Sequence, residues 1–173
     1  MQLETNRLCL KSLTLDDAET ILPVYLSSAD YLDTQTPDEP SIDLVREDLR
    51  LAAQQGAVTY GIFRRDTQDP IGVISFVPCS FRGQRDYAWL ASLMIQEADR
   101  LKGYGGEAYQ AVEAAIFADE AVTRIGTLLI PQFDASLRFA EKMGFERAGG
   151  PFKNKRGYGL YAFVKQRPGL PGT

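Results

Sequence analysis

The chain of 173 residues contains no histidine, and this absence excludes several kinds of site. Without histidine there is no Ser-His-Asp triad, no Cys-His pair and no HExxH zinc site. Cysteine is also scarce, because Cys9 and Cys79 are the only two and lie far apart without a CxxC motif. We therefore expect two buried free thiols, and neither a redox motif nor a metal site.

Long apolar runs are missing too. No stretch reaches the roughly 18 apolar residues of a membrane-spanning helix, and residues 1–7 carry no apolar segment typical of a secretory signal. The formal net charge of −4 argues against nonspecific binding to nucleic acid. We expect a cytoplasmic protein with no nucleic-acid or membrane partner. The length fits one domain over 1–165, followed by a flexible Pro/Gly tail over 166–173.

The periodicity of apolar residues predicts the order strand, two helices, three strands, helix, strand, helix, strand. The predicted strands cover 7–13, 58–64, 71–77, 87–95, 124–130 and 158–165. The predicted helices cover 15–26, the stretch between Ser41 and Gly56, 104–117 and 134–143. Loops are expected at 27–40, 78–86 and 149–157. Thr14, Ser41 and Asp134 are predicted N-caps, and Gly144 a left-handed helix end. This order predicts an α/β (α+β) fold, an antiparallel meander followed by a crossover unit.

The most informative stretch is LMIQEADRLKGYGGE at 93–107. A buried strand is predicted to end near Ile95, and a glycine-rich turn then leads into a helix. The first N–H groups of a helix lack partners and lie at the positive end of its dipole. Arg100 and Lys102 add positive charge, so the turn predicts a phosphate or pyrophosphate site. A plain strand-to-helix turn is the alternative. Neither GxxxxGK[ST] nor GxGxxG is present.

The run RLKGYGGE at 100–107 resembles the acyl-CoA binding signature, Q/R-x-x-G-x-G/A, of the GNAT superfamily of N-acetyltransferases. ASLRFAEKMGF at 135–145 resembles the second signature of that family, and IFRRDTQDPIGVI at 62–74 also fits. TNRLCLKSLTLDDA at 5–18 is similar to the start of the branch that includes ribosomal-protein alanine acetyltransferases. The resemblance covers about residues 3–165, with the stretches in the family's order.

This resemblance implies a mixed central sheet with splayed central strands, flanked by helices. It implies acetyl-CoA as co-substrate, held between the strands at 87–95 and 124–130, and no metal. The residues implied for the pantetheine arm, through their backbones, are Leu93, Met94 and Ile95. Those implied for the pyrophosphate, through their amides, are Arg100, Lys102, Gly103, Gly105 and Gly106.

The reaction implied is direct transfer of acetyl from the thioester to a primary amine, either a protein N-terminus or a small amine. Phe133 stands where many members have an asparagine, and Ala140 where many have a tyrosine acid. The candidates for the acid are Ser136, Tyr158 and Tyr161, and those for a base acting through water are Asp86 and Glu97. A homodimer is compatible with the resemblance. The alternatives are a non-catalytic acyl-CoA-binding or sensor module and a nucleotide-binding regulatory domain.

Substrate signals in the sequence are few. Four aromatic residues in or near the predicted loops either line an acceptor groove or simply pack; they are Tyr31, Phe81, Tyr87 and Trp89. The basic residues Lys153, Lys155 and Arg156 either meet an acidic group, such as the 3′-phosphate of the cofactor, or form a solvated loop.

Overall fold

The computed structural model describes residues 2–169, which form one eight-stranded sheet in the order β1-β2-β3-β4-β5-β6-β8-β7. The strands are β1 Gln2–Glu4, β2 Leu8–Ser12, β3 Val58–Arg64, β4 Pro70–Val77, β5 Tyr87–Ile95, β6 Arg124–Leu129, β7 Glu146–Lys153 and β8 Gly159–Gln166. All neighbours are antiparallel except β5 and β6. The predicted meander and the crossover that follows it are both confirmed.

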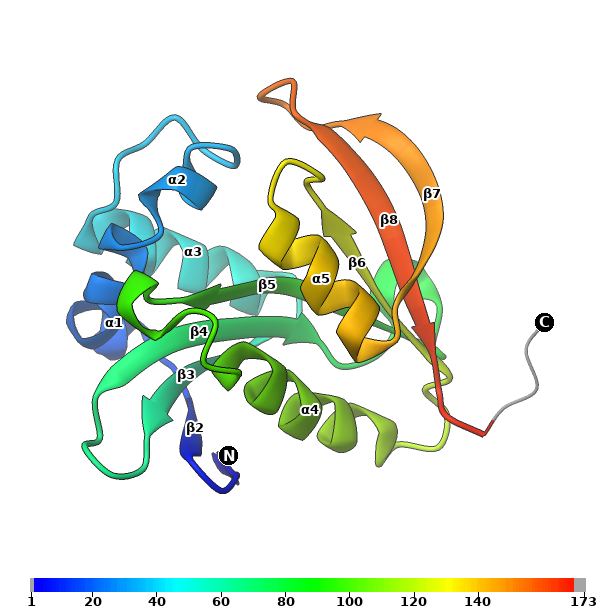
Figure 1. Cartoon of the computed structure of the whole chain (residues 1–173), viewed down its shortest axis with the longest axis horizontal. Coiled ribbons are helices and arrows are strands. Elements are labelled where there is room, and N and C mark those ends of the chain that lie inside the picture. Colours follow the sequence, from blue (N-terminus) through cyan, green and yellow to red (C-terminus); the bar gives the residue numbers. More distant parts are fainter. Residues whose placement is uncertain (1, 170–173) are drawn as a thin grey trace.

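Five α-helices cover the two faces of this sheet (Figure 1). They are α1 Ala18–Leu26, α2 Ala29–Leu32, α3 Ile42–Gln54, α4 Tyr104–Phe117 and α5 Asp134–Met143. Short 3₁₀ turns lie at Leu15–Asp17, Phe81–Gly83 and Glu97–Asp99. Among these helices none combines the length and the apolar character needed to cross a membrane.

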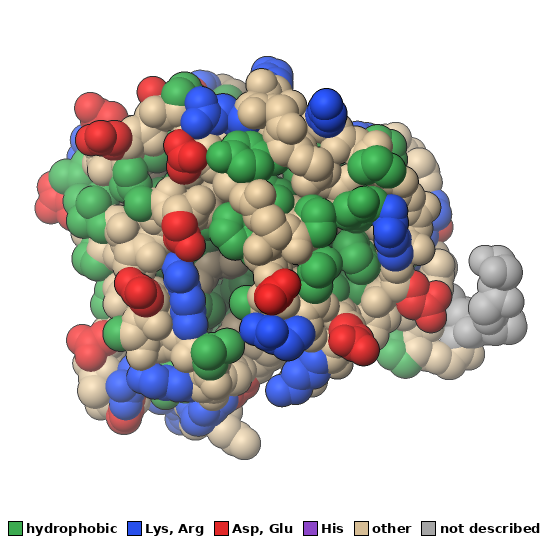
Figure 2. All heavy atoms as spheres, turned by 45° about the horizontal axis from the view of Figure 1, so that its top comes forward, with side chains coloured by type: hydrophobic (Ala, Val, Ile, Leu, Met, Phe, Trp, Pro, Cys, Tyr) green, Lys and Arg blue, Asp and Glu red, His purple; other side chains and the backbone are tan. Residues whose placement is uncertain are grey.

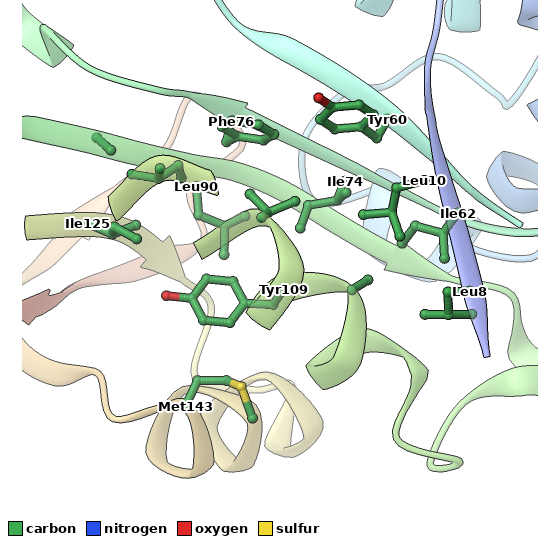
Figure 3. Packing of buried hydrophobic residues seen from close by; sticks show 14 of the residues in the cluster. Leu8, Leu10, Tyr60, Ile62, Ile74, Phe76, Leu90, Tyr109, Ile125 and Met143 are labelled. Carbon is green, nitrogen blue, oxygen red and sulfur yellow. The ribbon is translucent and has the colours of Figure 1, made fainter. Parts of the chain in front are cut away.

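Two groups of buried side chains lie on opposite faces of the sheet. On one face, Tyr109 of α4 and Met143 of α5 belong to the same cluster as Leu90 and Ile125 (Figure 3). On the other face, α1, α2 and α3 pack together with Val73 and Met94. The strand β5 therefore contributes to both layers, which places it between α1–α3 and α4.

An irregularity in β5 sets which of its side chains faces which layer. Opposite β4, Phe76 pairs with Leu90 and Ser75 pairs with Ser92, so Ala91 is an extra residue in β5. A bulge of this kind shifts the alternation by one residue. Leu90 and Leu93 consequently both pack on the α4 side, whereas Met94 packs with α1–α3.

Local signals placed most helix ends correctly. Ser41 accepts from the N–H of Leu44 at 3.2 Å, and Gly144 is left-handed at φ +81°. Thr14 makes a capping box with Asp17, but it caps the 3₁₀ turn at Leu15–Asp17, and α1 begins only at Ala18. The prediction that Asp134 is an N-cap is wrong, because it is the first helical residue and Phe133 precedes it as the cap. Cys9 is buried, as expected, but Cys79 is only half-buried.

Three predicted boundaries are also wrong. Residues 149–153, expected in a loop, belong to β7, whose register shifts accommodate the glycines and the proline. The predicted loop at 27–40 contains the helix α2. The strand β1, at the start of the chain, was not predicted at all. The expected tail starts too early, because Gln166 ends β8 and the Arg167 N–H bonds to the Thr123 carbonyl at 2.7 Å. Residues 170–173 lie outside the described residues.

Candidate active site

The parallel strands β5 and β6 pair along only part of their length. The pairing covers Tyr87 to Trp89 on β5 and Arg124 to Gly126 on β6, after which the two strands diverge (Figure 1). The hydroxyl of Thr127 still donates to the carbonyl of Leu90 at 3.0 Å. From there to Ile95, β5 is bonded to β4 on one edge and has no strand on the other. The expected splay of the central strands is confirmed.

The start of α4 lies just beyond the unpaired edge of β5. Gly103 precedes the helix in a left-handed conformation, φ +85°, and no side chain caps the first turn. The N–H groups of Tyr104, Gly105 and Gly106 therefore have no partner within the helix. A Cβ on Gly105 would lie 3.5 Å from Ile95 and 3.7 Å from Leu93, so the helix start packs directly against this edge.

Glu107 holds this helix start against the N-terminal strands. Its carboxylate accepts from the Thr5 hydroxyl at 2.5 Å, from the Arg7 N–H at 3.0 Å and from the Arg7 guanidinium at 2.6 Å. The same guanidinium donates to the Lys102 carbonyl at 3.1 Å and lies over the ring of Tyr104. Burial alone would raise the pKa of Glu107, but the bonds from Thr5 and Arg7 lower it below its usual value. The sequence-based prediction missed this contact.

The guanidinium of Arg100, which was predicted to add positive charge to the turn, has protein partners of its own that the sequence did not indicate. It donates to the carbonyls of Ile95 and Ser27, both at 3.0 Å, and lies 3.8 Å from the Asp30 carboxylate. The reason is that these carbonyls need a donor where β5 meets the end of α1. Lys102 stays half-exposed and pairs with Asp99 at 3.0 Å.

The two predicted bases lie beyond opposite ends of β5, a strand nine residues and roughly 30 Å long. Asp86 precedes the paired end, where it accepts from the Thr123 hydroxyl at 2.9 Å and lies 3.4 Å from Arg124. Glu97 follows the unpaired end and is exposed; its N–H donates to the Ser27 hydroxyl at 3.3 Å. Only Glu97 is therefore beside the divergent part of the strands.

The α5 helix begins on the other side of the split, directly after β6. Ser136 lies half-buried in its first turn, and its N–H donates to the Phe133 carbonyl at 2.9 Å. The ring of Phe133 meets that of Tyr31 edge-on, 6.2 Å between centroids. Ala140, at the position where many GNAT members have a tyrosine, is fully buried in the core. An acid at that position would therefore need a different local packing.

The predicted acid Tyr158 follows the β7–β8 turn. Its hydroxyl lies 3.4 Å from the carboxylate of Asp33, and its N–H donates to the side-chain oxygen of Asn154 at 3.0 Å. Tyr161, the third candidate, lies under the guanidinium of Arg147. Both tyrosines thus have protein partners.

Three of the aromatic residues considered for an acceptor groove pack on each other at the paired end of β5 and β6. Phe81 stacks on Trp89, with 4.3 Å between centroids, and Tyr87 meets both rings edge-on. Tyr31 alone lies at the divergent end. Across residues 2–169, no three Cys, Asp or Glu side chains are grouped to hold a metal ion.

An uncapped, glycine-rich helix start beside an unpaired strand edge suits a ligand that carries both a phosphate and an extended chain of amides. The family model of the acetyltransferase (GNAT) domain matches residues 7–146 of the chain. The uncharacterized N-acetyltransferase YoaA of Bacillus subtilis is 30% identical, over 95% of this chain and 97% of that protein. The chain belongs to the GNAT acetyltransferases and is an acyltransferase.

Solved structures with the same fold include acetyltransferases that differ in the substrate they are named for or in the ligands bound to them. The ribosomal-protein-S5-alanine acetyltransferase of Vibrio fischeri is 15% identical with a TM-score of 0.77, covering 99% of this chain and all of that one. AAC(6')-Ib, solved with paromomycin and acetyl-CoA, is 22% identical with a TM-score of 0.74, covering 94% of both chains. These likenesses confirm the predicted GNAT fold.

Proposed function

We propose that this enzyme transfers an acetyl group from acetyl-CoA to a primary amine, either a protein N-terminus or a small amine. The observation that carries the proposal is the unpaired edge of β5, which leads directly to the uncapped start of α4. Acetyl-CoA supplies the acetyl group as a thioester. The acetyl-CoA in the AAC(6')-Ib structure supports this choice of donor.

The backbone is the main binding element in this proposal. Alternate residues of β5 turn their N–H and C=O groups to the same edge, so Leu93 and Ile95 offer theirs to the amides of the pantetheine arm, as an added strand would, whereas those of Met94 face β4. The carbonyl of Ile95 already accepts from Arg100, so Ile95 contributes less. The amides around Arg100 and from Lys102 to Gly106 hold the diphosphate, aided by the positive end of α4.

The proton-transfer groups are proposed from position alone. The attacking amine has to lose a proton, and Glu97 is the predicted base that lies at the divergent end of β5. Ser136, in the first turn of α5, is the predicted acid nearest to the end of β6 in the chain. The free thiol has a pKa of about 8.5, so solvent is also able to protonate the leaving group.

The test is release of free thiol on mixing the enzyme with acetyl-CoA and a panel of amines: N-terminal peptides, aminoglycosides and polyamines. We expect thiol release above the enzyme-free rate with at least one acceptor. Binding of CoA without turnover on any amine would contradict the proposal and favour an acyl-CoA-binding module.

The binding site itself is tested by substitution of Gly105. Gly105→Val would place two methyl groups against the edge formed by Leu93 and Ile95, and we expect it to weaken CoA binding about tenfold or more. Gly105→Ala is the matched control, because its Cβ makes only ordinary contacts, and we expect a smaller loss. Calorimetric titration measures both, with thermal unfolding to show that each variant is folded. Unchanged affinity in the valine variant would contradict the assigned site.

A further inference from the structure

Residues 27–36, which run from the end of α1 through α2, contact three segments around the divergent end of β5 and β6. The first contact is with the turn after β5. Arg100 donates to the carbonyl of Ser27 at 3.0 Å, and the N–H of Glu97 donates to its hydroxyl at 3.3 Å. The second contact is with the start of α5, where Tyr31 meets Phe133.

The third contact joins residues 27–36 to the turn between β7 and β8. Arg156 forms an ion pair with Asp33 at 3.0 Å and also donates to its carbonyl at 3.0 Å. Asn154 donates to the carbonyl of Thr34 at 2.7 Å. These two segments lie more than 100 residues apart in the sequence, yet together they bridge the divergent end of the strands. Figure 2 shows this face, with charged side chains of both signs around a central hollow.

The three contacts differ in how readily they can separate. Within residues 27–36, the side chains of Ser28, Leu32 and Thr34 are buried, and they anchor this segment to the rest of the protein. In the Asp33–Arg156 pair, by contrast, the side chains are 62% and 33% exposed. Exposed ion pairs contribute little to stability, so within the third contact this pair is the part most easily opened.

We propose that the Asp33–Arg156 pair is a specificity-determining contact, which limits the size of the acceptor amine that reaches the divergent strands. This inference rests on the proposed function, in which acetyl-CoA occupies the side of α4 and α5. The acceptor then approaches past residues 27–36 and the β7–β8 turn. With the pair closed a slender amine passes, whereas an acceptor with several rings or a folded peptide needs the pair to open.

The test compares a small monoamine with a bulky aminoglycoside or peptide as acceptors. Arg156→Gln removes the ion pair. We expect the ratio of kcat/KM for bulky acceptors to kcat/KM for small acceptors to rise about two- to fivefold. This is the change that loss of one exposed ion pair makes to the equilibrium between the closed and open forms of the contact. The double variant with Asp33→Arg and Arg156→Asp restores opposite charges and should return the ratio toward its original value. Glu47→Gln is the matched control, because it breaks an exposed ion pair with Arg50 on α3.

A second measurement separates this proposal from the proposed function. Amide hydrogen exchange in residues 27–36 should quicken by a similar factor in Arg156→Gln, and it requires no turnover. Unchanged exchange, or faster exchange with an unchanged acceptor ratio, would overturn the role of the pair. CoA affinity should stay the same in every variant. Absence of turnover in the unmodified chain would refute the proposed function, and with it any role in acceptor selection.

Discussion

At the scale of single residues, Arg100 and Lys102 lie two positions apart in the glycine-rich turn but have different environments. Arg100 satisfies the carbonyls of Ile95 and Ser27, whereas Lys102 is half-exposed and pairs only with Asp99. Arg100→Ala leaves two carbonyls without their donor, so we expect a loss of about 1–3 kcal/mol in the free energy of unfolding. Lys102→Ala should cost less than about 1 kcal/mol. Urea unfolding of both variants measures the difference, and equal losses would contradict it.

The sequence located this turn correctly but did not indicate the partners of one side chain. The glycines and the lost helical periodicity are local signals, and they are enough to place an uncapped helix start at Gly103. The direction of Arg100 depends instead on Ser27, which a different part of the chain brings into reach. Local periodicity does not indicate which distant residue a side chain will contact. The hydrogen bond between Glu107 and Thr5 is a second contact of this kind.

At the scale of elements, Glu107 joins α4 to β2 and the turn before it, and this junction should respond to pH. Its pKa is lowered below the usual 4.5, so its stabilising contribution is full above that pH and is lost as the pH falls through the lowered value. We expect Glu107→Gln to be less stable than the unmodified chain at neutral pH, with a difference that shrinks between about pH 5 and pH 3. Urea unfolding across that range is the measurement. A difference independent of pH would show that the carboxylate charge is not involved.

Elements were predictable where their own residues carry the signal. Ser41 and Gly144 mark helix ends through their own side chain or backbone freedom. The strand β7 was missed because Gly149, Gly150 and Pro151 have the composition of a loop. Gly149 pairs with Ala162 of β8, whereas Gly150, at φ +101°, and Pro151 lie in an irregularity of the register that pairing on both sides keeps within the strand. Tertiary contact overrides local preference more readily in strands than in helices.

At the scale of the whole molecule, the sheet is joined across its middle by only three pairs of residues between β5 and β6. The buried core nevertheless spans both halves, since Ile74 and Leu90 pack in the same cluster as Ile125 and Phe145. The order of six of the eight strands and four of the five α-helices could be predicted from periodicity and resemblance, whereas β1, β7 and α2 were missed. The distance to which the two strands separate follows from this packing, as does the bridge that residues 27–36 form between their ends. Neither feature could be predicted from the sequence.

Gly126 lies at that junction, where the ring of Tyr87 covers it. A Cβ there would lie 2.8 Å from the Trp89 ring and closer still to the Tyr87 hydroxyl, and Tyr87 is itself held against Phe81. We expect Gly126→Ala to cost about 1–3 kcal/mol, which lowers the melting temperature by roughly 2–10 °C. Gly149→Ala is the control, because its Cβ would meet the Phe152 ring at an ordinary 3.5 Å. Scanning calorimetry should show one transition for each variant, since a single core holds both halves; two separate transitions in Gly126→Ala would mean that the halves unfold independently.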